Sequence, residues 1–145
     1  DYMLRLLEGD LPLSEVEALV AQMAADGRLT PSLVMTALCR GQLDFFTLSL
    51  AHFARVPVNN ALRLVDDRGM YGFTGIYDKA GFPPAMFDAI LIILRAVQDL
   101  QSSATVPGSL AYANRLVERV LLAAGNEPID YLPYFIALIR QTSRL

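Results

Sequence analysis

Apolar residues recur along this chain at the three- and four-residue spacing of amphipathic helices. Val16, Leu19, Val20 and Met23, for example, fall on one face of a helix. The same spacing recurs in the segments 31–40, 44–54, 58–67, 84–101, 109–124 and 129–144. No stretch alternates apolar and polar residues over the length of a strand, and the closest candidate, residues 69–77, contains three glycines that weaken a strand. The pattern therefore predicts an all-α fold of about eight or nine helices.

Prolines and glycines mark the expected helix boundaries. Proline is favoured in the first turn of a helix, where its missing N–H would have no partner anyway. Six prolines stand at such starts: Pro12, Pro31, Pro57, Pro83, Pro107 and Pro128. Five glycines stand where a periodic segment runs out, as C-terminal caps do: Gly27, Gly41, Gly69, Gly81 and Gly125.

Polar residues near these boundaries predict individual helix caps. Ser14 with Glu17 predicts a capping box, while Thr30 and Asp44 predict N-caps of the next two helices. Residues 84–101 are expected to form the longest helix, opened by a pair of prolines.

A proline-opened unit recurs in the middle of the chain. Residues 54–57 read Ala-Arg-Val-Pro and residues 80–83 read Ala-Gly-Phe-Pro, at a spacing of 26. A recurring helical unit predicts stacked helical hairpins, as in HEAT or armadillo superhelices, whose neighbours bury each other's apolar faces. An orthogonal helical bundle is the alternative. The length predicts a single all-α domain over residues 1–145. Because the chain lacks an initiator methionine, a second interpretation is that this domain is a fragment of a longer protein.

The composition excludes several classes of protein. Apolar residues make up 54% of the chain, and the mean hydropathy is +0.37. The longest apolar run, residues 89–94, is nevertheless far shorter than the ~20 residues that span a bilayer. We therefore expect no membrane span and, with no signal peptide visible, a soluble cytoplasmic protein. The single cysteine excludes a disulfide framework, and the net charge of −3 argues against nucleic-acid binding.

Short segments over most of the chain carry a family resemblance. They are residues 29–33 (LTPSL), 37–41 (ALCRG), 44–46 (DFF), 54–61 (ARVPVNNA), 67–69 (DRG), 80–83 (AGFP) and 129–132 (IDYL). In these segments the chain resembles an alphaproteobacterial family of domains of unknown function with HEAT-like helical pairs. The resemblance implies a helical fold and a bacterial intracellular setting, and it supplies no catalytic residues.

The two residue types that most often carry chemistry occur once each. His52, the only histidine, stands in a phenylalanine-rich helical segment, whereas a metal site needs three or four converging ligands. Cys39 stands near a helix C-terminus, whereas a nucleophilic thiol is activated at a helix N-terminus or by a cation. We therefore expect His52 to be structural or on the surface, and Cys39 to be a small buried residue.

Two other patterns resemble binding motifs without meeting their requirements. The glycine spacing of a phosphate-binding loop is approximated by Gly69, Gly72 and Gly75. Such a loop follows a strand, whereas here a helix precedes the glycines, and no Gly-Lys-Ser/Thr follows them. The aspartates at 66–67 and Asp78 lack the spacing of a calcium loop. We therefore predict no catalytic, cofactor-binding or metal-binding residues, and we expect a protein that is not an enzyme and uses no cofactor.

One segment combines the residue types that are enriched in protein interfaces. The predicted interaction surface consists of Arg68, Met70, Tyr71, Phe73 and Tyr77. The alternative is that these aromatic residues fill the core around a glycine-thinned helix. A second place where apolar surface is expected to meet another chain is the long helix from Pro84.

These observations predict a non-enzymatic helical interaction module, a scaffold or regulatory domain of a bacterial intracellular protein. The expected partner is another protein or a second copy of this chain, and not nucleic acid. The alternative is a small-molecule sensor domain with an apolar pocket between its helices.

Overall fold

A computed structural model of the chain describes residues 11–69 and 71–142, and within them all regular structure is helical. The prediction of an all-α fold is confirmed. The elements are α2 (Leu13–Ala25), α3 (Pro31–Cys39), α4 (Leu43–Ala54), α5 (Val58–Asp66), α6 (Gly72–Lys79), the short 3₁₀ helix η1 (Pro84–Met86), α7 (Phe87–Asp99), α8 (Leu110–Ala124) and α9 (Leu132–Thr142). None of the described helices is long and apolar enough to cross a membrane.

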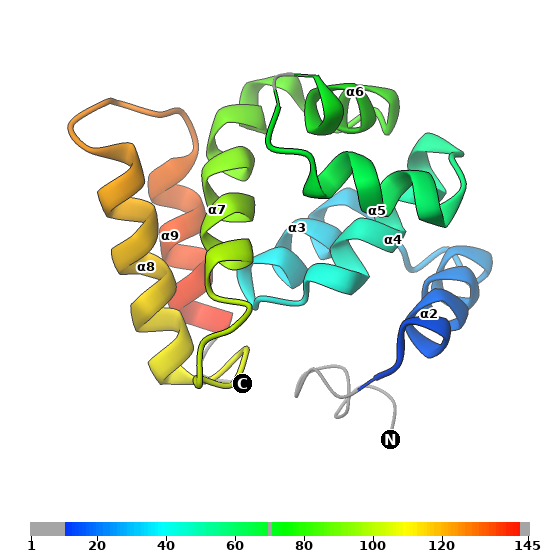
Figure 1. Cartoon of the computed structure of the whole chain (residues 1–145), viewed down its shortest axis with the longest axis horizontal. Helices are drawn as coiled ribbons and strands as arrows, with labels where there is room; N and C mark the ends of the chain where they lie inside the picture. Colours follow the sequence, from blue (N-terminus) through cyan, green and yellow to red (C-terminus); the bar gives the residue numbers. More distant parts are fainter. Residues whose placement is uncertain (1–10, 70, 143–145) are drawn as a thin grey trace.

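Helix α4 lies at the centre of the fold and contacts α2, α3, α5, α6 and α7. On one side of it, α7, α8 and α9 run side by side in alternating directions (Figure 1). Helix α3 joins the two parts because it packs against α4 as well as α7 and α9. The packing agrees with the predicted class, in which helices pack as a bundle or as stacked pairs.

The core is one continuous apolar cluster. Leu50 of α4, Ile90 and Ile93 of α7, Leu116 of α8 and Phe135 of α9 are all fully buried in it. Burying a side chain of this size stabilises a fold by about 1.5–3 kcal/mol relative to leaving it exposed. The helices are therefore held mainly by their shared apolar faces.

Two of the three predicted helix caps differ from the structure. Thr30 is the N-cap of α3, as predicted, and its Oγ1 accepts a 3.2 Å hydrogen bond from the Leu33 N–H. The capping box at Ser14 is wrong because α2 begins at Leu13, directly after Pro12, which leaves Ser14 inside the first turn. Asp44 likewise lies within the first turn of α4, after Gln42 at the N-cap. Both helices begin earlier than their polar residues suggest.

The recurring proline-opened unit corresponds to the same local geometry at both places. Arg55 after α4 and Gly81 after α6 both have a left-handed backbone, with φ of 58° and 79°. In each case an apolar residue and a proline follow, and the proline is the N-cap of the next helical element. Gly69 does not cap a helix as expected, because α5 ends at Asp66 and its C-cap, Asp67, is already extended. The Asp67 Oδ1 accepts a 2.8 Å hydrogen bond from the Gly69 N–H.

The helix lengths correct one further prediction. The segment from Pro84 begins as η1, continues as α7 and ends at Asp99, short of the predicted residue 101. Helix α8, with 15 residues, is longer than α7, with 13. The proline pair therefore opens a tight 3₁₀ turn rather than extending the α-helix. Helix α9 begins at Leu132 rather than 129, because Tyr131 has a φ of 69°.

Candidate functional site

The residues predicted to form an interaction surface lie in different environments. Tyr71 is 81% exposed, and Arg68 is also exposed. Phe73 and Tyr77 are buried, which corrects the predicted surface at these two positions in favour of the core alternative. Met70 lies outside the described residues. An interaction role for Arg68 and Tyr71 stays a prediction.

The buried face of α6 packs into a cluster of aromatic rings. Phe73, Ile76 and Tyr77 share this face because they are three and four residues apart. The Phe73 ring stacks on Phe87, with centroids 5.6 Å apart. The Tyr77 hydroxyl donates a 2.7 Å hydrogen bond to the Pro83 carbonyl, and burial raises the pKa of Tyr77 to about 12. These aromatics hold α6 to the start of α7.

Arg95 on α7 joins that helix to the end of α5. Its guanidinium donates to the carbonyls of Val65, at 3.0 Å, and Asp67, at 2.8 Å. The Gln98 side chain also donates to the Val65 carbonyl, at 3.1 Å. Carbonyls at a helix C-terminus lack partners within the helix, so Arg95 and Gln98 satisfy them. Burial, and then the charge of Arg68, lowers the pKa of Arg95.

A second set of charges ties the segment after α5 to α8. Asp99, at the end of α7, accepts hydrogen bonds from Arg119 at 2.9 Å and from Arg68 at 3.0 Å. These hydrogen bonds, Arg119's first, hold the pKa of Asp99 below its usual range against the opposing effect of desolvation. Because the three side chains are partly exposed, each pair is worth less than about 1 kcal/mol. Their main effect is to fix two guanidinium groups beside the surface between α7 and α8.

That surface is a shallow groove of about 510 Å³. The α7–α8 groove is lined by Leu91, Ile92, Arg95, Ala96, Asp99, Arg119, Leu122 and Ala123. Leu122 is 80% exposed, the highest exposure among the large aliphatic side chains described as exposed. Ala96 on α7 and Ala123 on α8 have short side chains, and this leaves the hollow between the larger aliphatic residues of the two helices.

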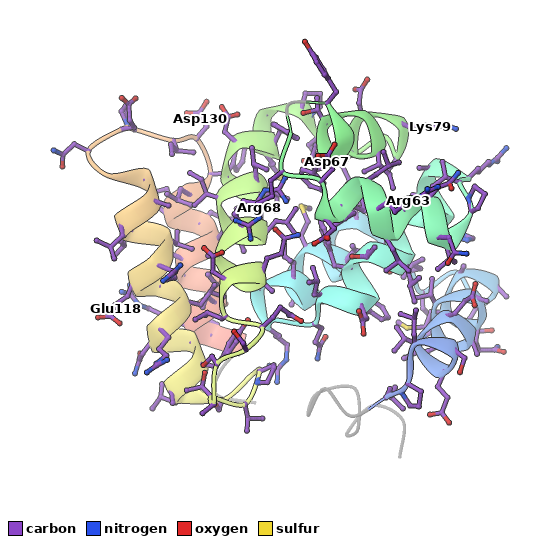
Figure 2. All side chains as sticks on the ribbon, in the orientation of Figure 1. Arg63, Asp67, Arg68, Lys79, Glu118 and Asp130 are labelled. Atoms are coloured by element: carbon purple, nitrogen blue, oxygen red, sulfur yellow. The ribbon has the colours of Figure 1, made fainter. Side chains whose placement is uncertain are left out.

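The groove continues towards the loop that follows α8. A second hollow of about 410 Å³ shares Leu91 and Ile92 with the first, and its other lining residues include Asp88, Glu127 and Asp130. Figure 2 shows Asp130 beside this loop and Arg68 further from it; Arg68 comes from the segment after α5 and binds Asp99 of α7. The α7–α8 groove therefore has an acidic end, lined by Asp88, Glu127 and Asp130, and a basic end, lined by Arg95, Arg119 and Asp99. Arg68 binds Asp99 from beside the groove.

One side of the groove is the helical segment from Pro84, which the sequence indicates as a second surface for contact with another chain. The other side, on α8, was not predicted from the sequence. The periodicity of α8 contains a signal for it. Leu116, Val117, Val120 and Ala124 make up a buried stripe of this helix, and Leu122 falls outside that stripe. Leu121 and Leu122 both lie off this stripe and are exposed, so the pattern predicts apolar surface on α8 without saying which leucine lines the groove.

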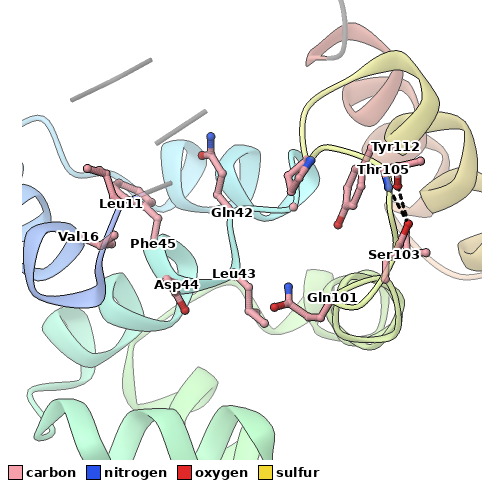
Figure 3. A pocket seen from close by; sticks show the side chains of 13 residues that line it. Leu11, Val16, Gln42, Leu43, Asp44, Phe45, Gln101, Ser103, Thr105 and Tyr112 are labelled. Carbon is pink, nitrogen blue, oxygen red and sulfur yellow. Dashed lines mark hydrogen bonds between the residues drawn. The ribbon is translucent and has the colours of Figure 1, made fainter. Parts of the chain in front are cut away.

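A smaller cavity of about 230 Å³ lies near the start of α4 (Figure 3). Its polar lining includes Gln42, Asp44, Gln101 and Tyr112. Desolvation raises the pKa of Asp44, and burial raises that of Tyr112 to about 12. The cavity is below the 300–1,000 Å³ that is usual for ligand pockets. Its mixed lining also differs from the apolar pocket expected for a sensor domain.

The residues considered for chemistry are dispersed. Cys39 is buried, as predicted, and burial raises the pKa of its thiol to about 12, so the reactive thiolate is suppressed. His52 is exposed, and its ring meets Phe53 edge-on with centroids 5.8 Å apart. Among residues 11–69 and 71–142, no three His, Cys, Asp or Glu side chains are grouped so as to hold a metal ion.

Comparison with known proteins identifies the family of the chain. A family model described as "Uncharacterised protein conserved in bacteria (DUF2336)" matches residues 4–128. The segment 129–132, included in the resemblance, lies beyond this match. No curated protein and no solved structure gives a significant match.

Proposed function

The chain belongs to the bacterial DUF2336 family, and we propose that it is a non-enzymatic interaction module that binds another protein through the α7–α8 groove. It acts in this proposal as a scaffold or regulatory domain in the bacterial cytoplasm. The recurrence of the proline-opened unit at Arg55 and Gly81 supports a helical-repeat character of the module, of the HEAT kind.

The observation that carries the proposal is the exposure of Leu122 beside an apolar hollow. An isolated leucine on a surface needs no explanation, but this one adjoins Leu91, Ile92 and Ala123 in one concave patch with charged ends. Protein interfaces have this form, with an apolar centre surrounded by a polar rim. Exposed Tyr71 is a further contact residue in this proposal.

Site-specific photocross-linking in bacterial cells tests the proposal. A photoreactive residue replaces Leu122 in one variant and Leu121 in the control; Leu121 is the adjacent exposed leucine on α8 and does not line the groove. We expect a protein adduct, identified by mass spectrometry, at position 122 and not at position 121. Equal adducts at both positions, or none at 122, would reject the groove as the binding face.

The second candidate function, a small-molecule sensor, would use the cavity near the start of α4, whose size and polar lining suit only a small polar molecule. Gln42, Asp44, Gln101 and Tyr112 present amide, carboxylate and hydroxyl groups to one small space. Native mass spectrometry of the purified chain tests it. A bound molecule lost on substituting Tyr112→Phe or Gln101→Ala supports the sensor; a mass equal to that of the chain alone counts against it.

A further inference from the structure

The α7–α8 groove has the shape and charge of a surface that can bind itself. A protruding side chain, Leu122, and an apolar hollow, formed around Ile92 and Ala96, lie on the same face. In a two-fold symmetric dimer, one surface patch meets the same patch on the other copy. Because this face carries both a projection and a hollow, the projection of each copy can enter the hollow of the other. The face can therefore pair with itself and needs no different partner.

The charges set the direction in which two such faces can meet. The acidic end contains Asp88, Glu127 and Asp130, with no basic side chain in its lining. The basic end is lined by Arg95 and Arg119 with Asp99 between their charges, and Arg68 binds Asp99 without lining the groove. Asp66 and Asp67 also act on Arg95, but neither lines the groove.

The two ends are far enough apart to act separately. Asp88 and Asp99 stand eleven residues apart on one helical segment, which corresponds to about 16 Å along the axis. Screening at physiological salt reduces interactions beyond about 8 Å. Two copies aligned in parallel would place acid on acid, whereas antiparallel copies place each acidic end on a basic end.

Helix α8 extends the basic end. Arg115 is exposed and stands one turn before Arg119 and two turns before Leu122. Residues at this spacing share one face of a helix. Arg115 and, by the same spacing, the exposed Glu118 are therefore on the side of α8 that carries Leu122, and Arg115 would meet the acidic end of an antiparallel copy.

From these observations we propose that a second copy of this chain occupies the α7–α8 groove, antiparallel, with the acidic end of each copy against the basic end of the other. This rests on the proposed function of the groove, and it names the partner. Helix α7 is only about 20 Å long, so the interface is small and the dimer is expected to depend on concentration.

Reversing the charge of one end at a time tests the arrangement. The acid-reversed variant carries Asp88→Arg and Asp130→Arg, and the base-reversed variant carries Arg115→Glu and Arg119→Glu. Either variant alone places like charges at both contacts of the dimer. An equimolar mixture of the two restores opposite charges at both contacts. A matched control, Glu17→Arg with Asp26→Arg, reverses two exposed acids, one on α2 and one at its C-cap. Helix α2 lies at the far side of the fold from α8 (Figure 1).

Sedimentation equilibrium of the full chain from about 5 to about 500 μM measures the association. We expect the wild type and the α2 control to dimerise alike, and each groove variant to associate at least about tenfold more weakly. The mixture should form a 1:1 heterodimer. Urea unfolding of each variant verifies that the fold is retained, and a variant that does not fold is replaced by its single substitutions, Asp88→Arg or Arg119→Glu.

The possible failures are distinct. A wild type that stays monomeric up to about 500 μM, or a mixture that does not recover association, overturns the antiparallel dimer. If cross-linking at position 122 then identifies a different protein, the proposed function stands with another partner. A monomer without any adduct at position 122 rejects both proposals.

Discussion

Arg119 on α8 donates a 2.9 Å hydrogen bond to Asp99 on α7. Arg68 donates to the other oxygen of the same carboxylate, at 3.0 Å, so one aspartate holds together three segments that are distant in sequence. The contact fixes the position of two guanidinium groups at one end of the α7–α8 groove. It also gives the basic end a dependence on pH.

Substitution of Asp99→Asn is expected to lower the free energy of unfolding by less than about 1 kcal/mol near neutral pH. The pKa of Asp99 is lowered in the folded protein, so its contribution is present above the unfolded pKa near 3.9 and is lost as the pH falls through the lower folded value. Urea unfolding of both proteins between about pH 2 and about pH 7 measures this. A difference that grows on acidification would contradict the ion-pair account.

Arg95 is expected to stabilise the fold more than the exposed arginines do. In Arg95→Met, the Asp67 carbonyl loses the donor at 2.8 Å, and the Val65 carbonyl keeps only Gln98. We expect a loss of about 1–3 kcal/mol in the free energy of unfolding. The control is Arg63→Met, since exposed Arg63 donates only to the exposed Asn60 side chain in the described contacts. Equal losses for both variants would show that Arg95 has no special role.

Gly41 and Tyr112 fit each other too closely for a larger residue at position 41. A Cβ at Gly41 would lie 2.5 Å from the Tyr112 hydroxyl oxygen, and the backbone φ of +82° disfavours side chains. We expect Gly41→Ala to destabilise the fold by about 1–3 kcal/mol. Gly27→Ala separates the two causes, because Gly27 has a φ of +71° and open space around its Cβ position. If thermal unfolding shows equal losses for both, the contact with Tyr112 is unimportant.

Tyr77→Phe removes the hydroxyl that donates to the Pro83 carbonyl at 2.7 Å. We expect a loss of about 1 kcal/mol in the free energy of unfolding. The raised pKa of Tyr77, about 12, means that its stabilising effect is complete below the unfolded value near 10 and is lost as the pH rises towards 12. The variant should therefore lose less stability than the wild type across this range. Tyr71→Phe, at an exposed position, is expected to leave the free energy of unfolding unchanged at neutral pH.

The fold class could be predicted from the sequence because each helix carries its own apolar stripe. The ends of the helices were less predictable. Ser14 and Asp44 resemble N-caps, yet α2 and α4 start earlier, since backbone carbonyls such as that of Pro12 accept the first N–H groups instead. Local side-chain preference is a weak term beside the packing of the buried face.

The candidate site could be predicted only in part. An aromatic residue has the same character whether it is buried or exposed, so composition could not separate Tyr71 from Phe73 and Tyr77. The spacing of Phe73, Ile76 and Tyr77 places these three residues on one face of α6. This separates them from Tyr71 once it is known which face of α6 packs against the core. The groove depends on where α8 lies against α7, and that follows from contacts between segments distant in sequence.

In the proposed dimer Leu122 lies in the interface and Leu121, its neighbour on α8, does not. Sedimentation equilibrium of Leu122→Asp and Leu121→Asp compares two exposed leucines on the same helix. We predict that Leu122→Asp weakens self-association at least about tenfold and that Leu121→Asp changes it less than about threefold. Equal weakening by the two substitutions, or unchanged association of Leu122→Asp, would contradict the account.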